Sequence, residues 1–192
     1  MKPKNAVRLA FPLAIAVLFA APSAKAATFY WDANGNSTSA VAATGTWGTD
    51  NFWSTDPLGG TATSPQTINN TSDLFFSAAS NSTGGIVTVS TTQAAHSITF
   101  DDATGAITLS GGTSINLGSA TAGSGIFSTN ATGSANIIST PLILNSAATA
   151  IAISNSGTQL QTIGAITGAA TSGTQTITVA SGICEYICSF LG

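Results

Sequence analysis

Short runs in which apolar and polar residues alternate recur along most of this chain. Apolar–Thr–apolar and apolar–Asn–apolar triplets are separated by clusters of Gly, Asn and Ser. A period of two with many β-branched residues is typical of strands, and the small polar clusters are typical of turns. The pattern therefore predicts an all-β protein with strands at 87–89, 97–100, 107–109, 115–117, 142–144, 151–153, 163–166 and 177–179.

Two all-β architectures fit strands of this length and spacing. A β-sandwich joins its strands by hairpins every 8–12 residues or so, whereas a solenoid stacks turns that each contain two or three short strands. We favour the solenoid, because many of the strands have only two apolar positions on one face. A right-handed parallel β-helix with roughly 20–25 residues per turn is the expected fold, and a β-sandwich is the alternative.

Aromatic residues divide the chain into zones. All three tryptophans, Trp31, Trp47 and Trp53, lie between residues 27 and 84, whereas residues 85–182 are dominated by Ile, Thr, Leu and Gly. We expect 27–84 to form an aromatic N-terminal cap with the first strands, because the end of a solenoid must be covered. Residues 85–182 are expected to form the strand repeats.

The first 26 residues have the features of a signal peptide. Lys2, Lys4 and Arg8 precede the apolar run 9–21, and Ala24-Lys25-Ala26 gives a small-residue cleavage pattern. The apolar run is shorter than the roughly 20 residues of a transmembrane helix. We therefore expect cleavage after Ala26, no membrane span in the mature chain, and export to the bacterial cell surface or the medium.

Removal of residues 1–26 would also remove every basic residue. The seven acids all lie after them, so the mature chain would carry no Lys or Arg and one histidine, His96. Nucleic-acid binding and polybasic membrane attachment both depend on Lys and Arg. We therefore expect no nucleic-acid partner, and the sequence predicts no cofactor and no metal site.

Candidate catalytic groups are few. His96 lies near Asp101 and Asp102 and could form a triad with one of many serines, but no G-x-S-x-G motif is present. We expect His96 to face solvent beside a turn at 101–105, and we predict no catalytic residue. Asp32-Ala33-Asn34-Gly35-Asn36 begins like a calcium loop but lacks its later Gly and Glu, so a simple turn is expected.

The stretch 104–118 (TGAITLSGGTSINLG) joins an apolar-Thr-apolar run and an apolar-Asn-apolar run through a Gly pair. It resembles the repeat of autotransporter-associated β-strand proteins. The segments 29–36, 45–48 and 51–54 are similar to the region that often follows the signal peptide of these proteins. The resemblance covers residues 27–182. It implies a right-handed parallel β-helix passenger on a bacterial surface.

Residues 183–192 form an atypical tail that contains both cysteines, Cys184 and Cys188. Passengers of the family end in an outer-membrane barrel or another sorting element. The chain has no set of strands that could form such a barrel, so a missing C-terminal domain, with truncation or a frameshift, is one expectation. The alternatives are a short apolar end cap and a docking tail. A disulfide between the two cysteines is possible in an exported protein, and free or intermolecular thiols are equally consistent.

The leading functional hypothesis is a non-enzymatic surface passenger fragment that serves as a structural or adhesive scaffold. Surface glycans or other cells would be the partners of such an adhesin. The alternative is a secreted glycan-binding module in which Trp31, Trp47 and Trp53 contact sugars, since exposed indole rings stack on sugar rings. For these three tryptophans we favour packing in the cap over sugar binding.

Overall fold

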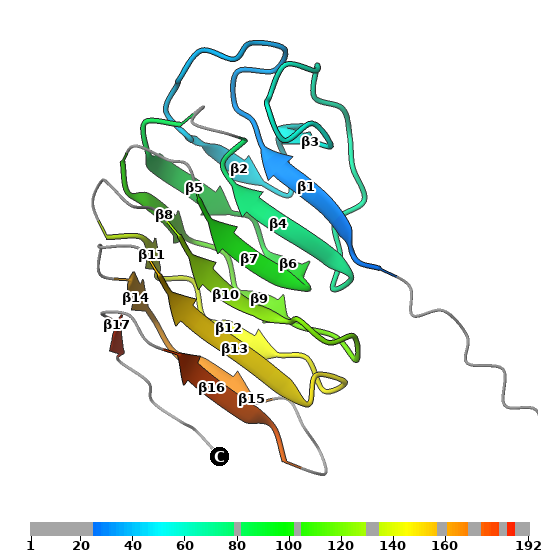
Figure 1. Ribbon diagram of the computed structural model, residues 1–192, viewed down its shortest axis with the longest axis vertical. Coiled ribbons are helices and arrows are strands. Elements are labelled where there is room, and N and C mark those ends of the chain that lie inside the picture. The colour runs from blue at the N-terminus through cyan, green and yellow to red at the C-terminus, as the bar shows by residue number, and fades with distance from the viewer. Residues whose placement is uncertain are drawn as a thin grey trace, which may run out of the picture.

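The computed structural model describes residues 25–78, 82–101, 105–129, 135–156, 161–168, 174–180 and 184–186. These residues form short strands and their connections, so the described part of the chain is all-β, as the alternation predicts (Figure 1). It contains no helix that is long and apolar enough to cross a membrane. The signal peptide proposed for residues 1–26 lies almost wholly outside the described residues.

The strands belong to three sheets. The seven-stranded sheet has the order β16 (Thr176–Ala180), β13 (Ala150–Asn155), β10 (Gly125–Ser128), β7 (Ser97–Phe100), β4 (Ser72–Phe76), β1 (Ala27–Trp31) and β3 (Trp53–Ser54). The six-stranded sheet has the order β17 (Cys184–Tyr186), β14 (Gln161–Ile163), β11 (Ile137–Ile138), β8 (Ile107–Ser110), β5 (Gly85–Val89) and β2 (Gly45–Trp47). The four-stranded sheet consists of β15 (Ile166–Gly168), β12 (Leu142–Leu144), β9 (Ser114–Leu117) and β6 (Thr92–Ala95).

From β4 onward, each strand pairs with the strand three places further along the chain, and every such pair is parallel. The separation between paired residues is shortest at 22, as between Gly85 and Ile107, and longest at 29, between Thr108 and Ile137. In Figure 1 the members of each sheet follow one another along the long axis of the molecule. The chain therefore advances along this axis by three strands at a time.

Hairpins are not the connection between neighbouring strands in this region. The Gly pair of the 104–118 stretch joins β8 to β9, and both glycines have positive φ, at 82° for Gly111 and 62° for Gly112. A Cβ at Gly112 would lie 2.6 Å from the Thr91 carbonyl oxygen, so the turn requires glycine. The turn sends β8 and β9 into different sheets. Among the described strands only β1 and β3 pair antiparallel, which argues against the sandwich alternative.

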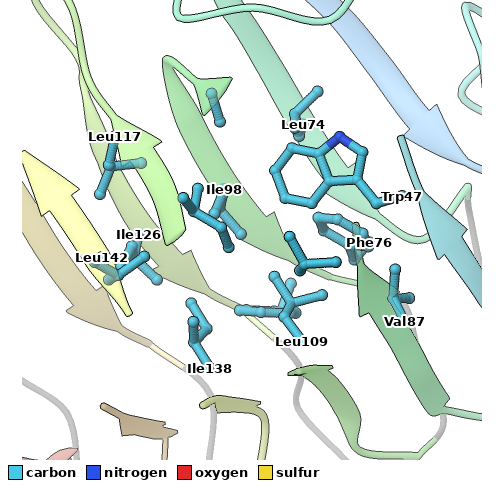
Figure 2. Close-up of a cluster of buried hydrophobic side chains, with 14 of the residues drawn as sticks. Trp47, Leu74, Phe76, Val87, Ile98, Leu109, Leu117, Ile126, Ile138 and Leu142 are labelled. Carbon is cyan, nitrogen blue, oxygen red and sulfur yellow. The ribbon is translucent and has the colours of Figure 1, made fainter. Parts of the chain in front are cut away.

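Much of the core consists of aliphatic side chains stacked in register. Leu74, Ile98, Ile126 and Ile153 occupy one line across β4, β7, β10 and β13, and each is at most 1% exposed. A second line runs through Val87, Leu109 and Ile138, and Figure 2 shows side chains of both lines in one interior cluster. Burying one such side chain contributes about 1.5–3 kcal/mol.

One predicted strand is wrong. Residues 163–166 were expected to form a single strand, but β14 ends at Ile163 and β15 begins at Ile166. Gly164 and Ala165 separate them, and the Gly164 amide donates to the Ile138 carbonyl oxygen at 2.8 Å. The two isoleucines thus end and begin strands of different sheets, and both side chains are buried.

Candidate functional site

An aromatic cluster fills the end of the molecule that contains β1, β2 and β3. The rings of Trp31 and Trp53 meet edge to face with centroids 5.0 Å apart, and Trp47 and Trp53 do so at 5.9 Å. Phe76 of β4 packs against all three indoles, at 5.3 to 6.0 Å. Edge-to-face contacts of this kind place the positive edge of one ring on the negative face of another.

This packing decides what the tryptophans can do. Trp31, Trp47 and Trp53 are 1%, 0% and 3% exposed, and their indole nitrogens have no hydrogen-bond acceptor among the described residues. An exposed sugar-stacking platform at Trp31, Trp47 and Trp53 is therefore not what the structure shows, and these side chains form core.

Three partly exposed aromatic side chains, Tyr30, Phe75 and Phe127, lie on the outer face of the seven-stranded sheet. Tyr30 pairs with Phe75, and their rings are 5.1 Å apart with a 34° tilt. Phe75 is in register with Thr99, which pairs with Phe127 on β10. Burial, together with the nearby charge of Asp101, raises the pKa of the Tyr30 hydroxyl. This row was missed in the sequence because its members are spread over nearly 100 residues and meet only through strand register.

His96 is buried, so the expectation that it faces solvent is wrong. It is 3% exposed and lies between β6 and β7. Its Nδ1 is 2.7 Å from Oδ1 of Asp73, and its Nε2 donates to the Thr121 carbonyl oxygen at 3.1 Å. The hydroxyl of Ser97 donates to the same Asp73 oxygen at 2.5 Å. His96 therefore links β4 to the loop between β9 and β10.

This network differs from a catalytic triad in its connections. In a triad the serine hydroxyl bonds to the histidine, which can then remove its proton. Here Ser97 and His96 both bond to Asp73, and the second ring nitrogen of His96 is occupied by a carbonyl oxygen. Both ring nitrogens of His96 thus have partners other than Asp101, and Asp102 lies outside the described residues. The geometry supports a structural role for His96.

A polar hollow of about 280 Å³ adjoins the aromatic cluster; we call it the cap hollow. Trp47, Trp53 and Ile68 contribute its apolar lining. Its polar lining comes from Asp50 and Asn51 in the turn after β2, from Gln66 and Thr67, and from Gln93 of β6. The hollow thus brings together three segments that are distant in sequence. No local motif marks it, which is why the sequence did not reveal it.

Two acidic side chains near this end serve as turn acceptors. Asp32 is 1% exposed, and its Oδ1 accepts the Asn34 amide at 3.2 Å, which makes residues 32–36 the expected turn. Asp56 is partly exposed and accepts the amides of Leu58 and Gly60 and the hydroxyl of Thr61. The Leu58 amide and the Thr61 hydroxyl lower the pKa of the Asp56 carboxyl. No cluster of three metal-ligating side chains occurs in the described ranges.

Only one of the two cysteines lies among the described residues. Cys184 begins β17, whose backbone pairs with β14, and Cys188 lies outside the described residues. The disulfide thus stays a prediction.

Comparisons of this chain with protein families, curated proteins and solved structures gave no match.

Proposed function

We propose that this chain is part of a right-handed parallel β-helix that acts as a non-enzymatic structural or adhesive scaffold on a bacterial surface. The observation that carries the proposal is the parallel pairing of each strand from β4 onward with the strand three places further along the chain. Leu74, Ile98, Ile126 and Ile153 occupy equivalent positions from β4 to β13, so an aliphatic core position recurs along one axis. A protein of this design gains length by adding repeats, which suits a stalk.

The chemistry of the buried polar groups supports a scaffold as well. Asn136 is fully buried, accepts the Ile107 amide at 3.0 Å and donates to the Ser128 hydroxyl at 3.2 Å. His96 and Asp73 likewise satisfy each other between strands. Polar side chains used in this way fix one strand relative to the next, because an unmade buried hydrogen bond is costly. The resemblance to autotransporter-associated repeats points to the same role.

Export is supported by the position of the first strand. β1 begins at Ala27, the residue directly after the predicted cleavage point. The Ala27 amide donates to the Thr71 carbonyl oxygen at 3.1 Å, so the first residue of β1 is held by a backbone hydrogen bond. If the protein is produced with its own leader in a Gram-negative host, we expect the exported form to begin at Ala27 by N-terminal sequencing. Retention of Met1 in the envelope fraction would contradict the proposal.

An in-register deletion tests the scaffold itself. Ser97 of β7 pairs directly with Gly125 of β10. Deletion of residues 97–124 therefore removes β7, β8 and β9 and joins His96 to Gly125, which takes the position of Ser97. We expect the shortened protein to keep a β-type circular dichroism spectrum and to lose length in small-angle X-ray scattering. The matched control is deletion of residues 97–110, which removes only β7 and β8. β9 of the four-stranded sheet would then follow β6 at the place of β7, a strand of the seven-stranded sheet, so this variant should not fold. Equal behaviour of the two deletions would reject the repeat scaffold.

A further inference from the structure

The cap hollow has the composition of a ligand site. Trp47, Trp53 and Ile68 give it an apolar part, and four carboxylate or amide side chains, together with two threonines, give it a polar part. Its volume of about 280 Å³ suits one small ring rather than a long chain. It is separate from the stacked core that supports the scaffold, because its polar side chains come from the turn after β2, from residues 66–67 and from β6.

Gln93 is held in place at this hollow. Its Nε2 donates to the Ser90 carbonyl oxygen at 2.8 Å and to the Ser90 hydroxyl at 3.3 Å. Gly48 has a φ of 97°, and a Cβ there would lie 2.3 Å from Nε2 of Gln93. Glycine at this position therefore leaves the space that the amide occupies. Because both contacts use the amide nitrogen, the side-chain oxygen of Gln93 is left as an acceptor.

Asp50 is oriented in a similar way. Its Oδ2 accepts the Thr46 amide at 2.7 Å, which fixes the carboxylate in the turn after β2. Asn51 follows it and is exposed, and Gln66 uses its Nε2 for the hydroxyl of Ser64 at 2.8 Å. Oδ1 of Asp50, the side-chain oxygen of Gln66 and the whole amide of Asn51 have no protein partner in the described part of the chain. The hollow thus offers fixed acceptors and one adaptable amide.

The charge of the hollow limits the ligand. Asp50 is its one charged lining residue, and no basic side chain lines it, so an anion would be repelled. Carboxylate and amide groups beside an indole and an aliphatic side chain match a molecule with one face of C–H groups and a rim of hydroxyls. We propose that the cap hollow binds a single neutral sugar unit, with its hydroxyls on Asp50, Asn51, Gln66 and Gln93. Ile68 and the small exposed part of Trp53 supply the apolar edge against which the ring lies, and Trp47 lies directly behind it.

The test is a titration of the exported protein with methyl glycosides of glucose, galactose, mannose and N-acetylglucosamine, followed by proton–nitrogen NMR. Trp47 and Trp53 line the hollow and Trp31 does not, so the three indole N–H signals form an internal comparison. We expect saturable shifts at Trp47 and Trp53, in the millimolar range for a ligand of this size, with Trp31 nearly unchanged. Saturation with none of the four sugars would overturn the proposal.

Variants keep the test independent of folding. Asn51→Ala and Gln66→Ala alter side chains that support no strand, and each should weaken binding about fivefold by loss of a hydrogen bond. Asn116→Ala, on β9 and away from the hollow, is the matched control and should bind as the unaltered protein does. Unchanged affinity in both hollow variants would overturn the proposal even if a sugar binds. The scaffold proposal is tested separately by the in-register deletion.

Discussion

The aromatic end of the molecule and the stacked repeats bury their side chains in different ways. At the aromatic end, β1, β2, β3 and β4 contribute rings that each contact several others, and one strand pair is antiparallel. In the repeats, aliphatic side chains stand in line and meet the equivalent residue of the strands on either side. The difference indicates that the aromatic end depends on each ring, whereas the repeats share their stability among equivalent layers.

The exposure of the outermost layers shows the same contrast. The line that contains Ile98 begins at Phe29, which is 8% exposed, and continues on β16 to Val179, which is 52% exposed. Phe29 lies beside the aromatic cluster, whereas Val179 has a paired strand on one side in the described structure. The line is thus covered at its Phe29 end and exposed at Val179.

The largest effect is expected from loss of a central ring. Trp31→Ala should lower the free energy of unfolding by about 3–5 kcal/mol, because the rings of Phe52, Trp53 and Phe76 would face a cavity. Urea denaturation followed by circular dichroism measures it. Tyr30→Ala, a neighbour on the outer face, is the control and should cost clearly less. Equal losses would remove the distinction between the cluster and the exposed row.

Loss of one aliphatic side chain from the repeats should lower the free energy of unfolding by less than loss of the central tryptophan does. Ile126→Ala removes a fully buried side chain from the middle of its line and should cost about 2–4 kcal/mol. The neighbouring residues of the line, Ile98 and Ile153, can partly close around the space. The same denaturation measurement applies, with Ile86→Ala as control, since Ile86 is 53% exposed. If Ile126→Ala lowers the free energy of unfolding as much as Trp31→Ala, the equivalent layers of the repeats do not share their stability in the way argued above.

The polar contact between layers should have a smaller effect. His96→Ala leaves the Asp73 carboxylate without its imidazole and the Thr121 carbonyl oxygen without its donor, at a cost of about 1–3 kcal/mol. Ser97→Ala removes one hydroxyl from the same carboxylate and should cost less. Hydrogen exchange at the amides of β7 and β10 would locate the loss. Unaltered exchange in His96→Ala would mean that the network does not couple the strands.

Several strands were predictable because the local pattern and the pairing agree. Residues 97–100 alternate, and β7 occupies them. β6, with the sequence TQAA, was missed because it lacks a β-branched apolar alternation and depends on its register with β9. The break at Gly164 and Ala165 was missed because two short apolar strands on either side read as one.

The candidate sites were less predictable, because their contacts cross between strands. Asp73 and His96 are 23 residues apart, and only the pairing of β4 with β7 makes them neighbours. Sequence proximity instead pointed to Asp101 and Asp102. The tryptophans were identified as a group, but whether they face solvent depends on Phe76, which the sequence could not place among them.

The smallest expected change is a gain in stability from a substitution at Asp32, which directly follows β1. Burial raises the pKa of the Asp32 carboxyl, while the amides of Asn34 and Gly35 act in the opposite direction. A raised pKa in the folded state means that the ionised form opposes folding near neutral pH. That cost is relieved as pH falls through the folded pKa toward the unfolded value. Asp32→Asn keeps an oxygen for the Asn34 amide and removes the charge, so it should stabilise the protein by about 1 kcal/mol at neutral pH.

The gain should shrink as the solution is acidified, because the unaltered Asp32 then becomes neutral too. Urea denaturation of both proteins at pH 7 and at about pH 3, below the ordinary carboxyl range, measures the difference. Asp32→Ala is the control: it removes the charge and also the acceptor for Asn34, so its turn should be weaker at both values. A gain for Asp32→Asn that is the same at both pH values would mean that the buried charge is not its cause. The aromatic end would then be limited by packing alone, in the same way as the aliphatic repeats.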